Sequence, residues 1–176
     1  AQVRLTESIH DGKSTVMLSP QYLSINQLRI EFDQKITEGH WITLAPHYVQ
    51  DMQQYKEQNG FGLVATYKYF LRKTPLYFGV GGQFTQNTYE NYAFDNTSKT
   101  KLWMYQSKAL QYGPNILSGS YFRVYPYLFI DLYYGLGYRF TKLSSSDGLD
   151  HFDRSFLGYD YSGVALLFGV RIGVML

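Results

Sequence analysis

The chain has no cysteine, and it has only 2 Trp and 5 Pro among 176 residues. Without Cys, neither a disulfide framework nor a thiolate metal site can form. The formal net charge is only +2, and no long basic run is present, so we expect no nucleic-acid partner. No stretch reaches the roughly 18 to 20 apolar residues that a membrane-spanning helix needs. These absences exclude small disulfide-rich domains and helical membrane proteins.

Aromatic residues and glycine are abundant instead. The chain contains 18 Tyr, 12 Phe and 16 Gly. Aromatic side chains fit the pleated surface of a sheet, and glycine fits bends and crowded interiors. A helical bundle would be richer in Ala, Leu, Glu and Lys. The composition therefore favours strands, and the length suits a single domain with a sizeable core.

Apolar and polar residues alternate with a period of two along much of the chain. From 128 to 140 the even-numbered residues are all apolar or aromatic, whereas the odd-numbered ones include Asp131, Gly135, Gly137 and Arg139. The last segment alternates in the same way: its even-numbered residues from Val164 to Leu176 are all apolar and share one face, and Arg171 lies on the other face. Because successive side chains of a strand point to opposite faces, each segment predicts one long strand between two different environments.

The alternation predicts eight strands in chain order. They span about 14–23, 26–36, 40–52, 59–72, 76–90, 107–124, 127–142 and 160–176. Short turns are expected near 37–39, 73–75 and 125–126, and longer loops at 53–58, 91–106 and 143–159. The first hairpin is expected to turn tightly near 24–26. Alternating short and long connections predict an all-β fold, an eight-stranded antiparallel up-and-down barrel with both termini at the short-turn end.

Two kinds of barrel could produce this alternation. In a soluble, calycin-like barrel the apolar face lines the interior, whereas in an outer-membrane barrel it meets lipid. The non-apolar faces here combine many glycines with sparse charges of both signs, which is typical of a crowded interior and not of a water-exposed strand. The apolar faces place Tyr towards strand ends, as interfacial aromatic belts do: Tyr22, Tyr48, Tyr67, Tyr69, Tyr112 and Tyr138. The sequence therefore favours a transmembrane barrel.

Two segments also carry a family resemblance. "LSPQYLSINQLRIEFDQKI" (18–36) and "GFGLVATYKYFL" (60–71) resemble the small OmpA/OmpX-like outer-membrane barrels, and more narrowly Bacteroidota barrel families of unknown function. The alternation at the C-terminus resembles the assembly signal of outer-membrane proteins, but it ends in Leu176 where an aromatic residue is usual. The resemblance covers nearly the whole chain from about residue 14. It implies an outer-membrane architecture and says almost nothing about activity.

Charged residues fall on the inward face of several predicted strands. We expect them to form a structural charge network in the barrel interior: Arg29, Glu31, Asp33, Lys68, Arg72, Arg123, Asp131, Arg139 and Arg171. A narrow anion pathway is the other interpretation. Eight strands leave too little room for an aqueous channel, so a network that plugs the interior is favoured.

No residue pattern indicates catalysis or cofactor binding. His47 is expected to point inward, but the H-x-S pair of outer-membrane lipid A deacylases is missing, because "HYV" follows at 47–49. The acidic loop 144–154 lacks the D-x-D-x-D-G spacing of a calcium loop. The "GVGG" at 79–82 lacks the lysine of a phosphate loop. We therefore expect no catalytic, metal-binding or cofactor-binding residue.

These observations predict a small non-enzymatic integral outer-membrane barrel, with a structural role or as an accessory subunit of an outer-membrane complex. The alternatives are an outer-membrane lipid-modifying enzyme and a soluble calycin-like ligand-binding barrel. The expected partners are outer-membrane lipids and another outer-membrane protein or complex. Residues 1–13 are expected to form a periplasmic N-terminal segment and residues 14–176 the barrel domain, with both termini in the periplasm.

Overall fold

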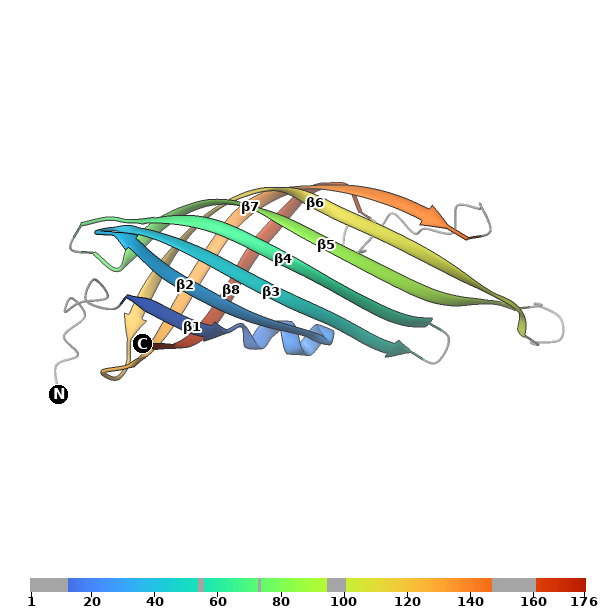
Figure 1. The fold of residues 1–176 in the computed structure, drawn as a ribbon, viewed down its shortest axis with the longest axis horizontal. Helices are drawn as coiled ribbons and strands as arrows, with labels where there is room; N and C mark the ends of the chain where they lie inside the picture. The colour runs from blue at the N-terminus through green and yellow to red at the C-terminus, as the bar shows by residue number, and fades with distance from the viewer. Residues whose placement is uncertain (1–12, 54–55, 73, 95–100, 147–160) are drawn as a thin grey trace.

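A computed structural model describes residues 13–53, 56–72, 74–94, 101–146 and 161–176. They form eight antiparallel strands in sequence order, closed by pairing of the first strand with the last. The expected eight-stranded antiparallel barrel is thus confirmed (Figure 1). The strands are β1 (Ser14–Leu18), β2 (Gln27–Thr37), β3 (His40–Gln53), β4 (Lys56–Phe70), β5 (Leu76–Phe94), β6 (Lys101–Arg123), β7 (Leu128–Ser145) and β8 (Gly163–Met175).

The first strand differs from the prediction. The expected strand at 14–23 ends at Leu18, and a short 3-10 helix, η1 (Pro20–Ile25), follows it. Pro20 suits the first turn of a helix, since its missing N–H has no partner there in any case. Asn26 ends η1 in the left-handed conformation, with φ of 55°. Tyr22, expected on the outer face, therefore lies on η1 and directs its hydroxyl to Arg29 and Tyr133.

Three strands are longer than expected at the end remote from the termini. β4 begins at Lys56, β5 continues to Phe94 and β6 begins at Lys101, so much of the expected loops 53–58 and 91–106 is strand. In the sequence these extensions lack the apolar-polar alternation of the other strands: residues 56–58 are all polar, and residues 102–105 are apolar or aromatic on both faces. The strand ladder continues there because backbone pairing does not depend on an apolar face.

Short connections lie at the end where the chain's C-terminus and the start of β1 are found (Figure 1). The β2–β3 turn uses Gly39 with φ of +77°, a conformation that glycine adopts without the strain a Cβ would bring. The β6–β7 turn closes with paired backbone hydrogen bonds between Val124, Tyr125 and Leu128. The expected N-terminal segment falls almost entirely outside the described residues.

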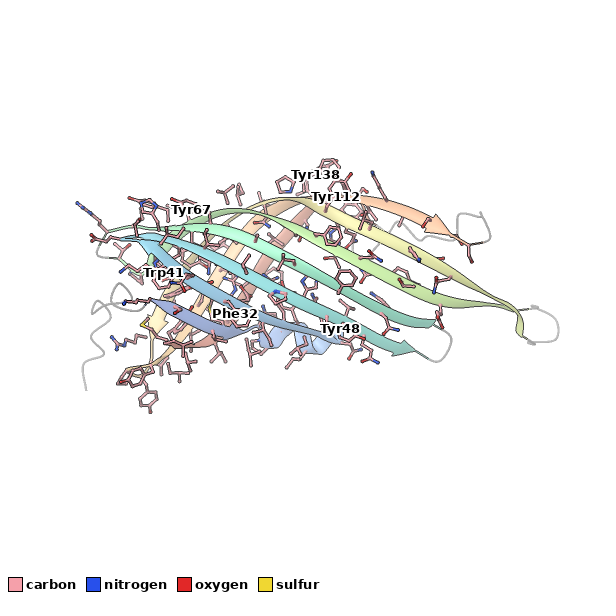
Figure 2. All side chains as sticks on the ribbon, in the orientation of Figure 1. Phe32, Trp41, Tyr48, Tyr67, Tyr112 and Tyr138 are labelled. Carbon is pink, nitrogen blue, oxygen red and sulfur yellow. The ribbon has the colours of Figure 1, made fainter. Side chains whose placement is uncertain are left out.

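Inward and outward side chains alternate as the sequence predicts. On β4 the residues from Phe61 to Phe70 are exposed and buried in strict turn. Figure 2 shows outward aromatic side chains such as Phe32, Tyr48 and Tyr138 on the barrel's outer surface. The exposed apolar residues lie on all eight strands and include Leu18, Phe32, Leu44, Leu63, Val80, Ile116, Leu136, Leu166 and Phe168. The apolar face is therefore outside, which is the reverse of a soluble lipocalin-like barrel.

Candidate functional site: the ion pairs inside the barrel

The barrel interior near the termini is filled by an aromatic cluster. Phe70 and Tyr77 contact each other and both contact Tyr121, with ring centroids 5.1 to 5.4 Å apart. Phe129 stacks on Tyr121 at 5.0 Å. All these residues lie next to the short turns, and each is at most 1% exposed. The cluster, completed by Met17, Trp41 and Leu117, closes the interior at this end.

Arg171 contacts this cluster at the hydroxyl of Tyr77 and joins two carboxylates from different strands. Its Nε is 2.8 Å from Oε1 of Glu31, and its Nη1 is 2.6 Å from Oδ2 of Asp131. Asp131 stands directly opposite Arg171 in the β7–β8 register. The guanidinium also lies 3.7 Å from the ring centroid of Tyr133, in cation–π geometry. A guanidinium can serve both carboxylates at once because its donors form a rigid planar fork.

Two further side chains contact the carboxylate of Glu31. Ser19, between β1 and η1, donates from Oγ to Oε1 at 2.7 Å, and the Arg29 Nε is 3.1 Å from the same oxygen. Tyr77 donates to Asp131, with its hydroxyl 2.9 Å from Oδ1. The first barrel strands are thereby connected to the last through buried, charge-assisted contacts, which are about twice as strong as neutral hydrogen bonds.

A second ion pair joins β2 to β4. The Lys68 Nζ lies 2.7 Å from Oδ2 of Asp33, and both side chains are fully buried. Tyr121 contacts both members: its hydroxyl accepts from Lys68 at 2.9 Å and donates to Asp33. The Lys68 ammonium also lies 5.1 and 5.3 Å from the ring centroids of Tyr77 and Tyr121. The aromatic cluster thus supports the ion pair as well as closing the barrel.

The structure brings together six of the nine residues expected in the network. Arg29, Lys68 and Arg171 carry three positive charges, and Glu31, Asp33 and Asp131 carry three negative ones, so the formal charges cancel. We call these six residues the ionic cluster. Because its charges balance, the ionic cluster has no excess of positive charge with which to attract an anion.

The other three residues lie away from the ionic cluster. Arg72 follows β4 and is exposed. Arg123 ends β6 and donates from Nε and Nη2 to the carbonyl of Pro126, at 3.1 and 2.5 Å. Arg139 lies on β7 beyond Asp131, about 26 Å along the strand at 3.3 Å per residue. Strand parity predicts an inward position for all three, but Arg72 lies past the end of β4 and is exposed. Parity also carries no information about the height of a residue along the barrel.

The tyrosines of the site were not assigned to it from the sequence. Tyr77, Tyr121 and Tyr133 hold the ionic cluster through their hydroxyls or ring faces. Their parity was a usable signal, because Tyr77 alternates with outward Leu76 and Phe78. The position of Ser19 and Tyr22 could not be found this way, since neither lies on a strand.

The two histidines among the described residues lie on opposite faces of β3. His47 points inward, as expected, with Nε2 3.0 Å from Oγ1 of Thr85, and it packs against Gly62. His40 lies at the rim, where Nδ1 contacts the hydroxyl of Tyr67 and the ring packs on Tyr69. His10, His151 and the acidic residues of the last loop lie outside the described residues. Among the described residues, no group of three His, Asp or Glu side chains could hold a metal ion.

No family model and no curated protein matches the chain. The chain is similar to Neisserial surface protein A. The match to its crystal structure covers 93% of this chain and 94% of that one, with 13% sequence identity and a TM-score of 0.41. At this level of similarity the architecture rests on the chain's own strand pairing, and the narrower resemblance to Bacteroidota families stays a prediction. Across the described residues, no helix has the length and apolar character to cross a membrane.

Proposed function

We propose that the chain is a small, non-enzymatic barrel of the bacterial outer membrane that serves as a structural or accessory subunit of an outer-membrane complex. The observation that carries the proposal is the apolar outer surface of a barrel whose charges are paired inside. A water-soluble protein rarely exposes apolar patches beyond a few hundred Å². Here large apolar side chains are exposed on every strand.

The dimensions of the apolar surface support insertion in a bilayer. On β4 the outward residues from Phe61 to Tyr69 are all apolar or aromatic. They span about 27 Å along the strand and, at a tilt of about 40°, about 21 Å in height. The apolar band of outer-membrane barrels is about 25 Å tall. Tyr67 and Tyr69 lie at one edge of this band, and Tyr48, Tyr112 and Tyr138 lie near the other, as an aromatic belt requires.

The lengths of the connections support a periplasmic position for both termini. Outer-membrane barrels have short periplasmic turns and longer extracellular loops. The short turns here share an end with the C-terminus and the start of β1 (Figure 1). In the sequence, residues 146–162 separate β7 from β8, which is a much longer connection. The proposed orientation places the end of the barrel opposite the short turns at the cell surface.

The surroundings of the possible catalytic groups, which are the buried carboxylates and His47, support a non-enzymatic role. The buried carboxylates of Glu31, Asp33 and Asp131 are all held by cations. The neighbour of the His47 Nε2 is a threonine hydroxyl in the barrel wall. A general base needs a reacting group within hydrogen-bond reach. The contacts described for these groups are instead to other side chains of the barrel itself.

Membrane fractionation and gel mobility test the proposal. We expect the protein to remain in the outer-membrane fraction after alkaline carbonate extraction and to migrate faster on detergent gels unless it is heated. Co-purification in mild detergent should yield a second outer-membrane protein in fixed ratio. A protein that is fully soluble and folded without detergent would contradict the membrane assignment. Hydrolysis of lipid A or phospholipid by purified protein, lost in His47→Ala, would contradict the non-enzymatic assignment.

A further inference from the structure

The wall of the barrel is incomplete beside β8. β1 pairs with β8 only from Thr15–Met175 to Leu18–Ile172. β8 continues to Gly163, and its residues 163–171 pair with β7 alone within the described part of the chain. On the other side of the gap, the residues from Gln27 to Arg29 of β2 pair only with β3. We call this gap, between residues 163–171 of β8 and residues 27–29 of β2, the seam.

The helix η1 fills the seam from within but does not complete the sheet. Its Gln21 donates to the hydroxyl of Tyr133 at 3.3 Å, and Gln21 also lies against Gly169 of β8. Arg29 donates to the Tyr22 hydroxyl at 3.0 Å. These are side-chain contacts. Among the described residues, no hydrogen bond between two backbone groups joins η1 to β8. A 3-10 helix uses its own backbone groups internally, so it cannot act as the missing strand.

The seam lies at the depth of the apolar surface. The outward residues of this part of β8 are Val164, Leu166, Phe168 and Val170, and all are exposed. Phe168 is the most exposed of them at 76%, and Leu166 follows at 65%. Both also line an apolar hollow of about 700 Å³ that extends over the outer side of β5–β8. A large apolar surface therefore adjoins a row of backbone groups that have no strand partner among the described residues.

Lipid cannot form hydrogen bonds with the backbone groups of residues 163–171. The hydrocarbon core offers neither donors nor acceptors, and each unpaired backbone group there costs several kcal/mol. Lipid-exposed sheet edges do not occur at this depth for that reason. Nine residues span about 30 Å along a strand, which matches a tilted crossing of the bilayer. The chemistry of the seam therefore fits a polypeptide strand.

A second copy of this chain is the wrong occupant. Two copies inserted in the same orientation are related by an axis along the membrane normal, and their β8 edges then run in the same direction at the same height. In that arrangement N–H faces N–H and carbonyl faces carbonyl. Strand pairing requires donors opposite acceptors.

We propose that the seam is the docking site for an apolar strand of a different outer-membrane protein, which adds to the β8 edge at residues 163–171. This inference rests on the proposed function and specifies where the accessory subunit meets its partner. The added strand continues the sheet by backbone pairing, as in other cases of strand addition. The outward side chains of the added strand pack beside Leu166 and Phe168, which are exposed on β8.

Photo-crosslinking in the intact outer membrane tests the seam. The photoreactive analogue p-benzoylphenylalanine replaces Phe168 in one variant and Phe61 in the other. Phe61 is a matched control because it is outward and 56% exposed, but it lies on β4, which is paired on both sides. We expect a discrete protein adduct at position 168 and none at 61. Mass spectrometry should map the crosslinked peptide to an alternating apolar segment of another membrane barrel.

Amide hydrogen exchange supplies the second measurement. In detergent-purified protein without a partner, the amides of residues 163–171 should exchange faster than those of residues 60–70, and the partner should slow them. An adduct with twice the mass of this chain, equal adducts at both positions, or none at 168 in a correctly inserted barrel would overturn the seam proposal alone. A protein that fails the carbonate and heat-modifiability tests would overturn the proposed function as well.

Discussion

At the scale of single residues, Arg171 joins two buried carboxylates that lie on different strands. It contacts Glu31, Asp131 and Tyr77 by hydrogen bonds and Tyr133 by its ring face. It lies on the last strand, and its two carboxylate partners lie on β2 and β7. Because desolvation offsets much of the Coulomb attraction of buried pairs, their contribution lies mainly in the cost of leaving a partner unpaired. The ionic cluster therefore enforces one arrangement of the closing strands.

Replacement of Arg171 by Met should destabilise the barrel strongly. It leaves two buried carboxylates without their shared cation, a change that costs about 3–5 kcal/mol in other proteins. The matched control is Arg72→Met, which removes an exposed charge and should change the free energy of unfolding by about 0.5 kcal/mol or less. Urea unfolding in lipid vesicles, followed by tryptophan fluorescence, measures both. Equal stabilities of the two variants would show that the ionic cluster does not support the fold.

The sequence was least informative about which single residues contact each other. Parity placed Arg29, Glu31, Asp33, Lys68, Asp131 and Arg171 on inward faces, but it could not say which of them meet. That depends on strand register, which sets Asp131 opposite Arg171 and leaves Arg139 far along β7. Alternation with a period of two does not determine strand register, because a shift by an even number of residues leaves every side chain on the same face.

At the scale of elements, close approach between strands explains several glycines. A Cβ on Gly135 of β7 would lie 2.2 Å from the carbonyl oxygen of Ile116 on β6. A Cβ on Gly82 of β5 would have nothing nearer than 3.6 Å. The first position therefore needs glycine for space and the second does not. Sequence reasoning assigned such glycines to crowding in general, which was sufficient for the fold class but not for the separate positions.

The substitution Gly135→Ala should lower the free energy of unfolding by about 1–3 kcal/mol, since the backbone of β6 or β7 must move to admit the methyl group. Gly82→Ala should be neutral or stabilise by up to about 1 kcal/mol, because alanine loses less conformational freedom in a strand. The same vesicle unfolding experiment compares the two. If Gly82→Ala proved the more damaging of the pair, the β6–β7 approach described here would be wrong.

The first element shows why local pattern can mislead. Val16, Leu18, Pro20 and Tyr22 have the parity of one strand, yet the strand ends at Leu18. Pro20 has no N–H to donate to a ladder, and the chain turns inward instead, where Ser19 and Tyr22 reach Glu31 and Arg29. These partners lie on β2, so the competing contacts could not be seen in the segment itself. The shortened β1 is also what creates the seam.

At the scale of the whole molecule, the account depends on which face of the barrel is apolar. The closed architecture was predictable because long alternating segments are the strongest signal a strand can give. The direction of the faces was predictable from glycine and sparse charge on one side and tyrosine at the strand ends on the other. The apolar outer surface, the aromatic closure at one end and the neutral ionic cluster together describe a barrel that is closed at the short-turn end and apolar outside, as the proposed function requires.

Site-directed spin labelling along β4 measures most directly what surrounds the apolar outer face of the barrel. The chain has no cysteine, so single-cysteine variants at positions 63, 64, 65, 66 and 67 can each carry one nitroxide. In lipid vesicles, collisions with lipid-soluble oxygen and with a water-soluble nickel complex report the surroundings of each label. The account predicts high oxygen accessibility at 63, 65 and 67, low oxygen accessibility at 64 and 66, and little access for nickel at any of them. High nickel accessibility at 63, 65 and 67 would mean that the apolar face meets water, and would contradict the account.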